Sequence, residues 1–115
     1  MNLNDAILSH VEWKQKLEAH LEGSEELDPE VVGADTLCEL GEWIAATRRP
    51  EPEFQKLREA HAEFHRQAAQ VVIAAAKCSA AEAIKMLDYA TDFGMASTSF
   101  VNAILDIRDK FGAAA

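Results

Sequence analysis

Residues 52–77 read P-E-F-Q-K-L-R-E-A-H-A-E-F-H-R-Q-A-A-Q-V-V-I-A-A-A-K, and this stretch decides the fold. Steps of three and four residues separate its inward positions, which are Phe54, Leu57, His61, Phe64, Ala68, Val71 and Ala75. Such spacing places side chains on one face of an α-helix. Pro50 or Pro52 suits the first turn, where a missing N–H costs nothing. We therefore predict a long helix that ends near Lys77 and buries His61.

The rest of the chain has the same helical character. It contains 115 residues, of which 5 are Gly and 3 are Pro. Its abundant Ala, Leu, Glu and Lys lose little rotamer freedom in helices, and strand-favouring runs are missing from the sequence. The length suits one modest core. We predict an all-α protein with a single domain over residues 1–115.

Capping residues and helix breakers divide the N-terminal part of the chain. A first helix should start at Asn4 or Asp5 and run to about Glu22, because Asn and Asp cap helix N-termini. Its apolar stripe consists of Leu3, Ile7, His10, Leu17 and Leu21. We therefore expect His10 to point inward. The acidic segment 24–33 contains a proline and is predicted to be a connecting loop.

A short helix is predicted to follow this loop. Thr36 and Glu39 form a capping box, and the helix should stop before Pro50. Cys38 would then lie in its first turn. The positive end of the helix dipole favours a thiolate at that position.

The last helix should begin after Ser79, which forms a second capping box with Glu82, and should continue to about Lys110. Small polar residues interrupt it, namely Thr91, Gly94, Ser97, Thr98 and Ser99. Three long helices and one short helix with brief connections predict an antiparallel four-helix bundle, in which the short helix carries the cysteine.

Charge excludes several classes of partner. The net charge of −9 and the pI near 4.8 leave no basic surface with which to bind nucleic acid or an anionic membrane. The sequence has no secretory signal pattern and no apolar stretch of about 20 residues. We expect a cytoplasmic protein in which Cys38 and Cys78 are thiols or thiolates.

Four residues form a candidate metal site. His10, Cys38, His61 and His65 provide three imidazoles and one thiolate, a closed tetrahedral set for one zinc ion per chain. His61 and His65 are four residues apart, so their Cβ atoms should lie about 5–6 Å apart on one helix face. That pair alone is weak evidence. However, inward histidines on two different helices require a shared compensation, which a metal supplies.

The other candidate residues favour structural roles. Cys78 is expected to pack at the end of the long helix, and His20 to act as a cation near the end of the first helix. The sequence leaves open whether a carboxylate such as Asp88 or Asp92 orients one of the imidazoles.

The arrangement of these patches resembles the chemoreceptor zinc-binding (CZB) domains of bacterial signalling proteins. That family has a His three residues before a Trp, a Cys-x-Leu/Phe-Gly-x-Trp block and a His-x-x-x-His pair. The matching residues here are His10 with Trp13, Cys38 with Leu40, Gly41 and Trp43, and His61 with Phe64 and His65. The resemblance covers nearly the whole chain.

The resemblance implies a cytosolic four-helix bundle that binds one zinc through three histidines and one cysteine. It also implies a homodimer attached to a chemoreceptor or a diguanylate cyclase, for which it senses zinc or oxidants. No output region follows Gly112 in the sequence. We expect either an excised domain or a standalone protein, with its signalling output domain in cis or in trans.

Several functional alternatives follow from the same residues. Zinc itself could be the signal, or oxidation of the Cys38 thiolate could weaken its metal bond. We do not expect an enzyme, because hydrolytic zinc needs an open position and a di-iron bundle needs repeated Glu-x-x-His segments. A metal-free helical protein-interaction module is the remaining alternative.

Overall fold

A computed structural model describes residues 2–23, 26–33, 39–88 and 90–112. Within these ranges the chain forms six helices and no strands, which confirms the predicted all-α class. They are α1 (Leu3–Leu21), α2 (Pro29–Val32), α3 (Glu39–Thr47), α4 (Pro52–Ala75), α5 (Ala80–Lys85) and α6 (Asp92–Phe111). None of these helices combines the length and the apolar character that crossing a membrane requires.

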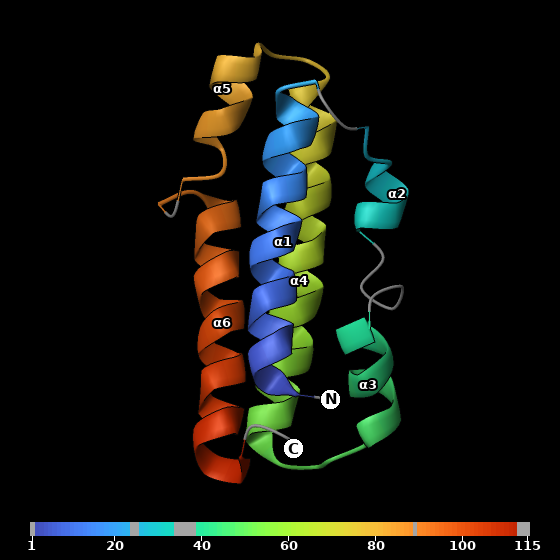
Figure 1. Ribbon diagram of the computed structural model, residues 1–115, viewed down its shortest axis with the longest axis vertical. Helices are drawn as coiled ribbons and strands as arrows, with labels where there is room; N and C mark the ends of the chain where they lie inside the picture. The colour runs from blue at the N-terminus through green and yellow to red at the C-terminus, as the bar shows by residue number, and fades with distance from the viewer. Residues whose placement is uncertain (1, 24–25, 34–38, 89, 113–115) are drawn as a thin grey trace.

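The long helices α1, α4 and α6 stand side by side and each contacts the other two (Figure 1). α1 and α4 run in the same direction, whereas α6 runs in the opposite one. α2 and α3 follow one another along the remaining side of α4. The three predicted long helices are thus present, α2 and α3 take the place of the single short helix that was predicted between the first two, and α5 lies at one end.

The periodicity of α4 explains the core. Phe54, Leu57, Phe64, Ala68 and Val71 are all at most 3% exposed, as the steps of three and four predicted. They pack against apolar residues of the other two long helices, including Leu3, Leu17, Phe93, Phe100, Ile104 and Ile107. His10, as predicted, lies on the buried face of α1.

The loop predicted over residues 24–33 is partly wrong, because it contains α2. Asp28 caps this helix by accepting a hydrogen bond from the N–H of Glu30 (2.9 Å), and Pro29 occupies its first turn. These are sequence signals for a helix start, although the segment is acidic and short. Val32 is 1% exposed and anchors α2 to the core.

The long last helix was also predicted wrongly, because it is two helices separated by residues 86–91. Ser79 caps α5 as expected, and its Oγ accepts from the N–H of Glu82 (3.2 Å). Thr91 caps α6 and accepts from the N–H of Gly94 (3.2 Å). A threonine that satisfies a free N–H favours a new helix start over continuation. Gly94 and Ser97 therefore lie inside α6 instead of interrupting it.

The predicted start of the short helix and its capping box at Thr36 lie outside the described residues. The described part, α3, ends at Thr47 before Pro50, as predicted.

Candidate metal centre

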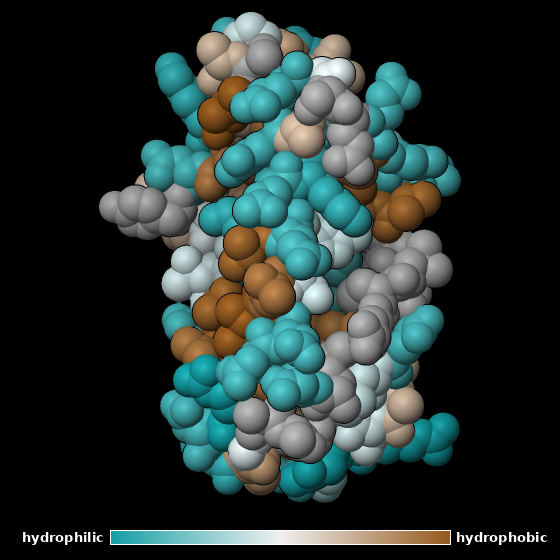
Figure 2. All heavy atoms as spheres, in the orientation of Figure 1, coloured by the Kyte–Doolittle hydropathy of each residue, from teal (hydrophilic) through white to brown (hydrophobic). Residues whose placement is uncertain are grey.

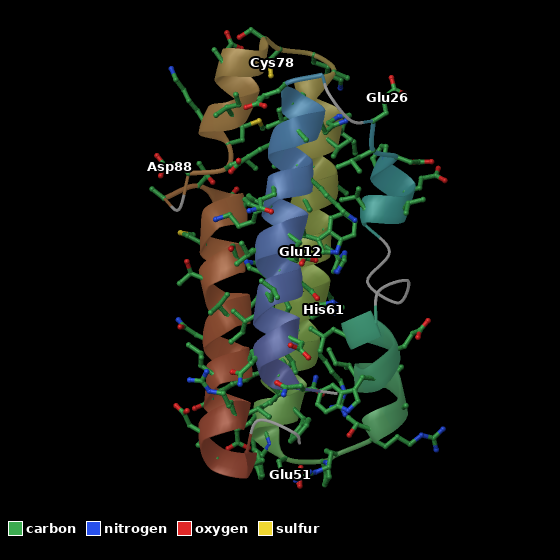
Figure 3. All side chains as sticks on the ribbon, in the orientation of Figure 1. Glu12, Glu26, Glu51, His61, Cys78 and Asp88 are labelled. Carbon is green, nitrogen blue, oxygen red and sulfur yellow. The ribbon has the colours of Figure 1, made fainter. Side chains whose placement is uncertain are left out.

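Three of the four predicted ligands are buried in the middle of the bundle. His10 comes from α1, whereas His61 and His65 come from adjacent turns of α4, and their exposed fractions are 4%, 2% and 3%. In Figure 3, His61 lies at mid-height of the bundle. Together, the three imidazoles line one cavity of about 180 Å³. The structure thus gathers the histidines around a common space.

His61 and His65 form the tightest part of this cluster, with their Nε2 atoms 3.1 Å apart. Nδ1 of His65 lies 2.8 Å from the carbonyl oxygen of Val32. Because a carbonyl can only accept, Nδ1 carries the proton and Nε2 of a neutral His65 presents its lone pair. Two nitrogens bound at about 2.0–2.1 Å to a tetrahedral zinc lie about 3.3 Å apart. The pair already has nearly that separation.

His10 has one satisfied and one unsatisfied ring nitrogen. Its Nε2 lies 2.7 Å from Oγ of Ser97 on α6. Its buried Nδ1 has no hydrogen-bond partner among the residues that the structure describes. Burial, together with the charges of Lys14 and His65, lowers the pKa of His10 from 6.5 to about 4. At neutral pH the imidazole is uncharged, which is the form that binds a metal.

Aromatic rings pack around the histidines. The His10 ring lies 4.4 Å from the Phe64 ring and 5.0 Å from the Phe100 ring, measured between centroids. The Trp13 ring contacts His65 edge-on at 5.9 Å. Apolar groups around a metal site influence its solvent access and its local dielectric.

The donor cluster is incomplete in the described part of the chain. No three His, Cys, Asp or Glu side chains there come close enough to hold an ion, so His10 lines the cavity without joining the histidine pair as a ligand set. Cys38, the fourth predicted ligand, lies outside the described residues. Leu40, two positions further along the chain, does line the cavity.

Two residues that were judged structural keep structural roles. Cys78 is half-buried against the core, and Figure 3 places it at the α5 end of the bundle, far from His61. Nδ1 of His20 accepts a hydrogen bond from the N–H of Leu27 (3.1 Å), and His20 thereby ties the chain after α1 back to that helix.

The polar neighbour of His10 is a residue whose role sequence reasoning missed. Asp88 points away from the bundle at the α5–α6 connection and does not face the histidines (Figure 3). Ser97 faces His10 instead, and it is 6% exposed. The sequence does carry a signal for this role, because Ser97 is a polar residue on an otherwise apolar face of α6. The other members of that face are Phe93, Phe100, Ile104 and Ile107.

The chain was compared with protein families, curated proteins and solved structures. A family model described as the chemoreceptor zinc-binding domain matches residues 10–72, more than half of the chain. The matched segment begins at His10 and contains Cys38, His61 and His65. No curated protein and no solved structure shows significant similarity to the chain.

Proposed function

Because the chain belongs to the chemoreceptor zinc-binding domain family, a family of zinc-binding signalling domains, we propose that it is a sensory domain that binds one zinc ion through His10, Cys38, His61 and His65. The observation that carries this proposal is the buried pair of Nε2 atoms 3.1 Å apart, in a cavity that is also lined by His10, whose Nδ1 has no hydrogen-bond partner within the described ranges. The predicted resemblance to this family is confirmed.

The chemistry of the donor set favours zinc. Imidazole nitrogens and a thiolate are the ligands of closed tetrahedral zinc sites, whereas calcium and magnesium require oxygen ligands. We assign Nε2 of His61, Nε2 of His65 and Nδ1 of His10 as donors, because the other nitrogens of His65 and His10 are engaged with Val32 and Ser97. Four protein ligands leave no position for a reactive water, which supports a regulatory role.

Cys38 is two positions before Leu40 in the sequence. Leu40 itself is buried and lines the cavity. The thiolate would complete the set and bring the charge of the occupied site to +1.

Signalling requires that the ligands connect helices that can repack. His10 belongs to α1 and the other histidines to α4, while Cys38 precedes α3 in the chain. Zinc would tie these segments together, and its loss would release them. Binding shifts such an equilibrium only through different affinities for the two packings.

Two signals are compatible with this site, namely zinc concentration and an oxidant. In the second case, the Cys38 thiolate attacks one oxygen of hydrogen peroxide. The S–O bond forms as the O–O bond breaks, and the departing hydroxide takes up a proton to leave as water. The sulfur is oxidised to the sulfenic acid level, which weakens its bond to the metal.

We also propose that the domain is a cytoplasmic homodimer that controls an output domain in cis or in trans. Leu8 and Val11 on α1 are 57% and 43% exposed. Figure 2 shows hydrophobic side chains gathered on the face formed by α1 and α6. An exposed apolar patch of this kind favours a protein interface.

The test is the metal content of protein purified without added zinc, measured by elemental analysis. We expect about one zinc per chain, by the tetrahedral stoichiometry of such sites. Cys38→Ser and His61→Ala should lose it. Cys78→Ser and His20→Ala are the matched controls and should keep it. A wild-type protein that stays metal-free after incubation with zinc would refute the proposal and leave a metal-free interaction module.

A further inference from the structure

The hydrogen bond between His10 and Ser97 joins residues 87 positions apart. Nε2 of His10 lies 2.7 Å from Oγ of Ser97, and both side chains are buried. Ser97 belongs to α6, which begins at Asp92 and lies beyond the segment that the family model matches. The contact is therefore a feature of this chain that the family assignment leaves undefined.

We propose that Ser97 is a positioning residue of the zinc site, one that fixes the tautomer and the orientation of His10. This inference rests on the proposed function. When Nε2–H donates to Oγ of Ser97, the lone pair of the neutral ring resides on Nδ1. That atom is buried and has no partner among the described residues. Ser97 thereby prepares Nδ1 as the metal donor.

The opposite polarity of this hydrogen bond is unfavourable. If the Ser97 hydroxyl donated to Nε2, the ring proton would reside on Nδ1. A buried donor would then lack an acceptor among the described residues, which is a costly arrangement. A metal ligand at Nδ1 and a donated proton at Nε2 satisfy both nitrogens at once.

The orientation of the ring is restricted on its other sides as well. Phe64 and Phe100 contact the His10 ring at centroid distances of 4.4 Å and 5.0 Å, with interplanar angles of 51° and 71°. These rings limit its tilt, but they do not distinguish one nitrogen from the other. The hydroxyl of Ser97 supplies that distinction, because it forms a hydrogen bond with Nε2 and not with Nδ1.

A consequence is that zinc binding would also constrain the position of α6. The metal would hold His10, His10 would hold Ser97, and α1 would be fixed against α6 through a hydrogen bond. Thermodynamic linkage makes this coupling reciprocal. If zinc binding opposes the separation of α1 from α6 by some factor, separating the two helices would lower the zinc affinity by the same factor. The site would thus involve all three long helices.

The experiment compares Ser97→Ala with Ser97→Thr and Ser99→Ala. Thr keeps the hydroxyl, and Ser99 is exposed on the same helix. Zinc affinity is measured by competition with a chromophoric chelator, and folding is monitored by circular dichroism. We expect Ser97→Ala to bind zinc roughly 10-fold or more weakly, as for other groups that orient metal-bound histidines. Ser97→Thr should recover most of the affinity, and Ser99→Ala should match the wild type.

A second readout is independent of any variant. The ¹⁵N chemical shifts of the histidine rings in the zinc-loaded wild type report which nitrogen carries the proton. We expect a protonated Nε2 and a metal-bound Nδ1 for His10. The reverse assignment overturns the inference even where Ser97→Ala fails to fold.

The outcomes separate this inference from the proposed function. If the wild type binds zinc and Ser97→Ala binds it equally well with unchanged ring shifts, Ser97 has no positioning role although the zinc site exists. If the wild type binds no zinc, the proposed function and this inference are both overturned.

Discussion

The carbonyl oxygen of Val32 lies 2.8 Å from Nδ1 of His65, so the short helix α2 is hydrogen-bonded directly to a candidate zinc ligand. This contact orients the imidazole in the way that outer carbonyl groups orient metal-bound histidines. It also means that the position of α2 against α4 influences the site. Gly33 at the end of α2 makes this relationship testable.

Replacing Gly33 by alanine should displace α2. A Cβ atom at this position would lie 3.2 Å from Cβ of Ala69 on α4 and 3.2 Å from the carbonyl oxygen of Pro29. Both contacts are tighter than normal, so we expect Gly33→Ala to destabilise the fold by about 1 kcal/mol, as overpacking does. It should also weaken zinc binding through the hydrogen bond from His65 to Val32. Urea denaturation and chelator competition measure the two effects.

The compensating change is Ala69→Gly, which removes the Cβ atom on the α4 side. Zinc affinity lost in Gly33→Ala should be partly restored in the double variant, although Gly within α4 lowers stability by about 1 kcal/mol relative to Ala. Equal zinc affinity in the wild type and Gly33→Ala would show that α2 does not orient His65.

The pKa of His10 predicts an acid sensitivity of the metal-free protein. Its folded value is about 4 and its ordinary value is 6.5, so the unfolded chain binds more protons between these limits. Stability is therefore unaffected by this group above about pH 6.5 and falls as the pH decreases toward 4. Between pH 7.5 and 5 the loss should be about 2 kcal/mol.

Urea denaturation in the presence of a chelator measures this loss, and His10→Gln is the reference because it retains a polar side chain without the titration. The difference between the two pH profiles isolates the contribution of His10, because every other ionisable group is present in both proteins. The lowered pKa values of the half-buried Glu51, Glu53 and Glu63 affect both proteins equally, at lower pH. Parallel profiles from pH 7.5 to 5 would contradict the assigned pKa.

Sequence periodicity predicted the histidines better than it predicted their surroundings. His10 and His61 were found because they occupy inward positions of single helices, which depend only on local spacing. His65 lies one position beside the predicted stripe and is nevertheless 3% exposed, because α2 covers that side of α4. The contacts with Val32 and Ser97 span 33 and 87 residues, and no local pattern specifies such distances.

Helix starts were predicted unevenly. Ser79 was identified as a capping residue, whereas Asp28 was assigned to a loop and Thr91 to an interruption within one long helix. The hydrogen bonds that Asp28 and Thr91 accept show that each of them starts a helix. This interpretation leads to a prediction at Thr91.

Removing the Thr91 hydroxyl should weaken the start of α6. Oγ1 accepts from the N–H of Gly94 and lies 2.7 Å and 2.6 Å from the carbonyl oxygens of Met86 and Asp88. We expect Thr91→Ala to cost about 1–2 kcal/mol of unfolding free energy, and Thr91→Ser to recover most of it.

Thr98→Ala is the matched control for this substitution. Thr98 donates to the carbonyl of Gly94 (3.0 Å) within α6, where Ala is the better helix former. Its replacement should therefore leave stability unchanged or raise it slightly. A Thr91→Ala variant as stable as Thr98→Ala in urea would show that Thr91 does not fix the α5–α6 break.

Arg49 should couple the turn before α4 to the end of α6. Its guanidinium carbon lies 4.7 Å from the ring centroid of Phe54 and 5.0 Å from that of Phe111. Its backbone carbonyl also accepts from the Arg58 guanidinium (3.1 Å). A double-mutant cycle of Arg49→Ala and Phe111→Ala in urea should give a coupling energy of about 0.5–1 kcal/mol, typical of a partly exposed cation–π contact.

Glu51→Gln tests whether charge pairing explains that coupling instead. Glu51 accepts from Nε of Arg49 at 3.0 Å and 3.2 Å, but their side chains are 31% and 37% exposed, so the ion pair should contribute little. High salt should accordingly leave the Arg49–Phe111 coupling nearly intact. A coupling that vanishes in Glu51→Gln or in 1 M salt would assign the interaction to the ion pair. The cation–π contact between Arg49 and Phe111 would then contribute nothing to the link between the end of α6 and the turn that follows α3.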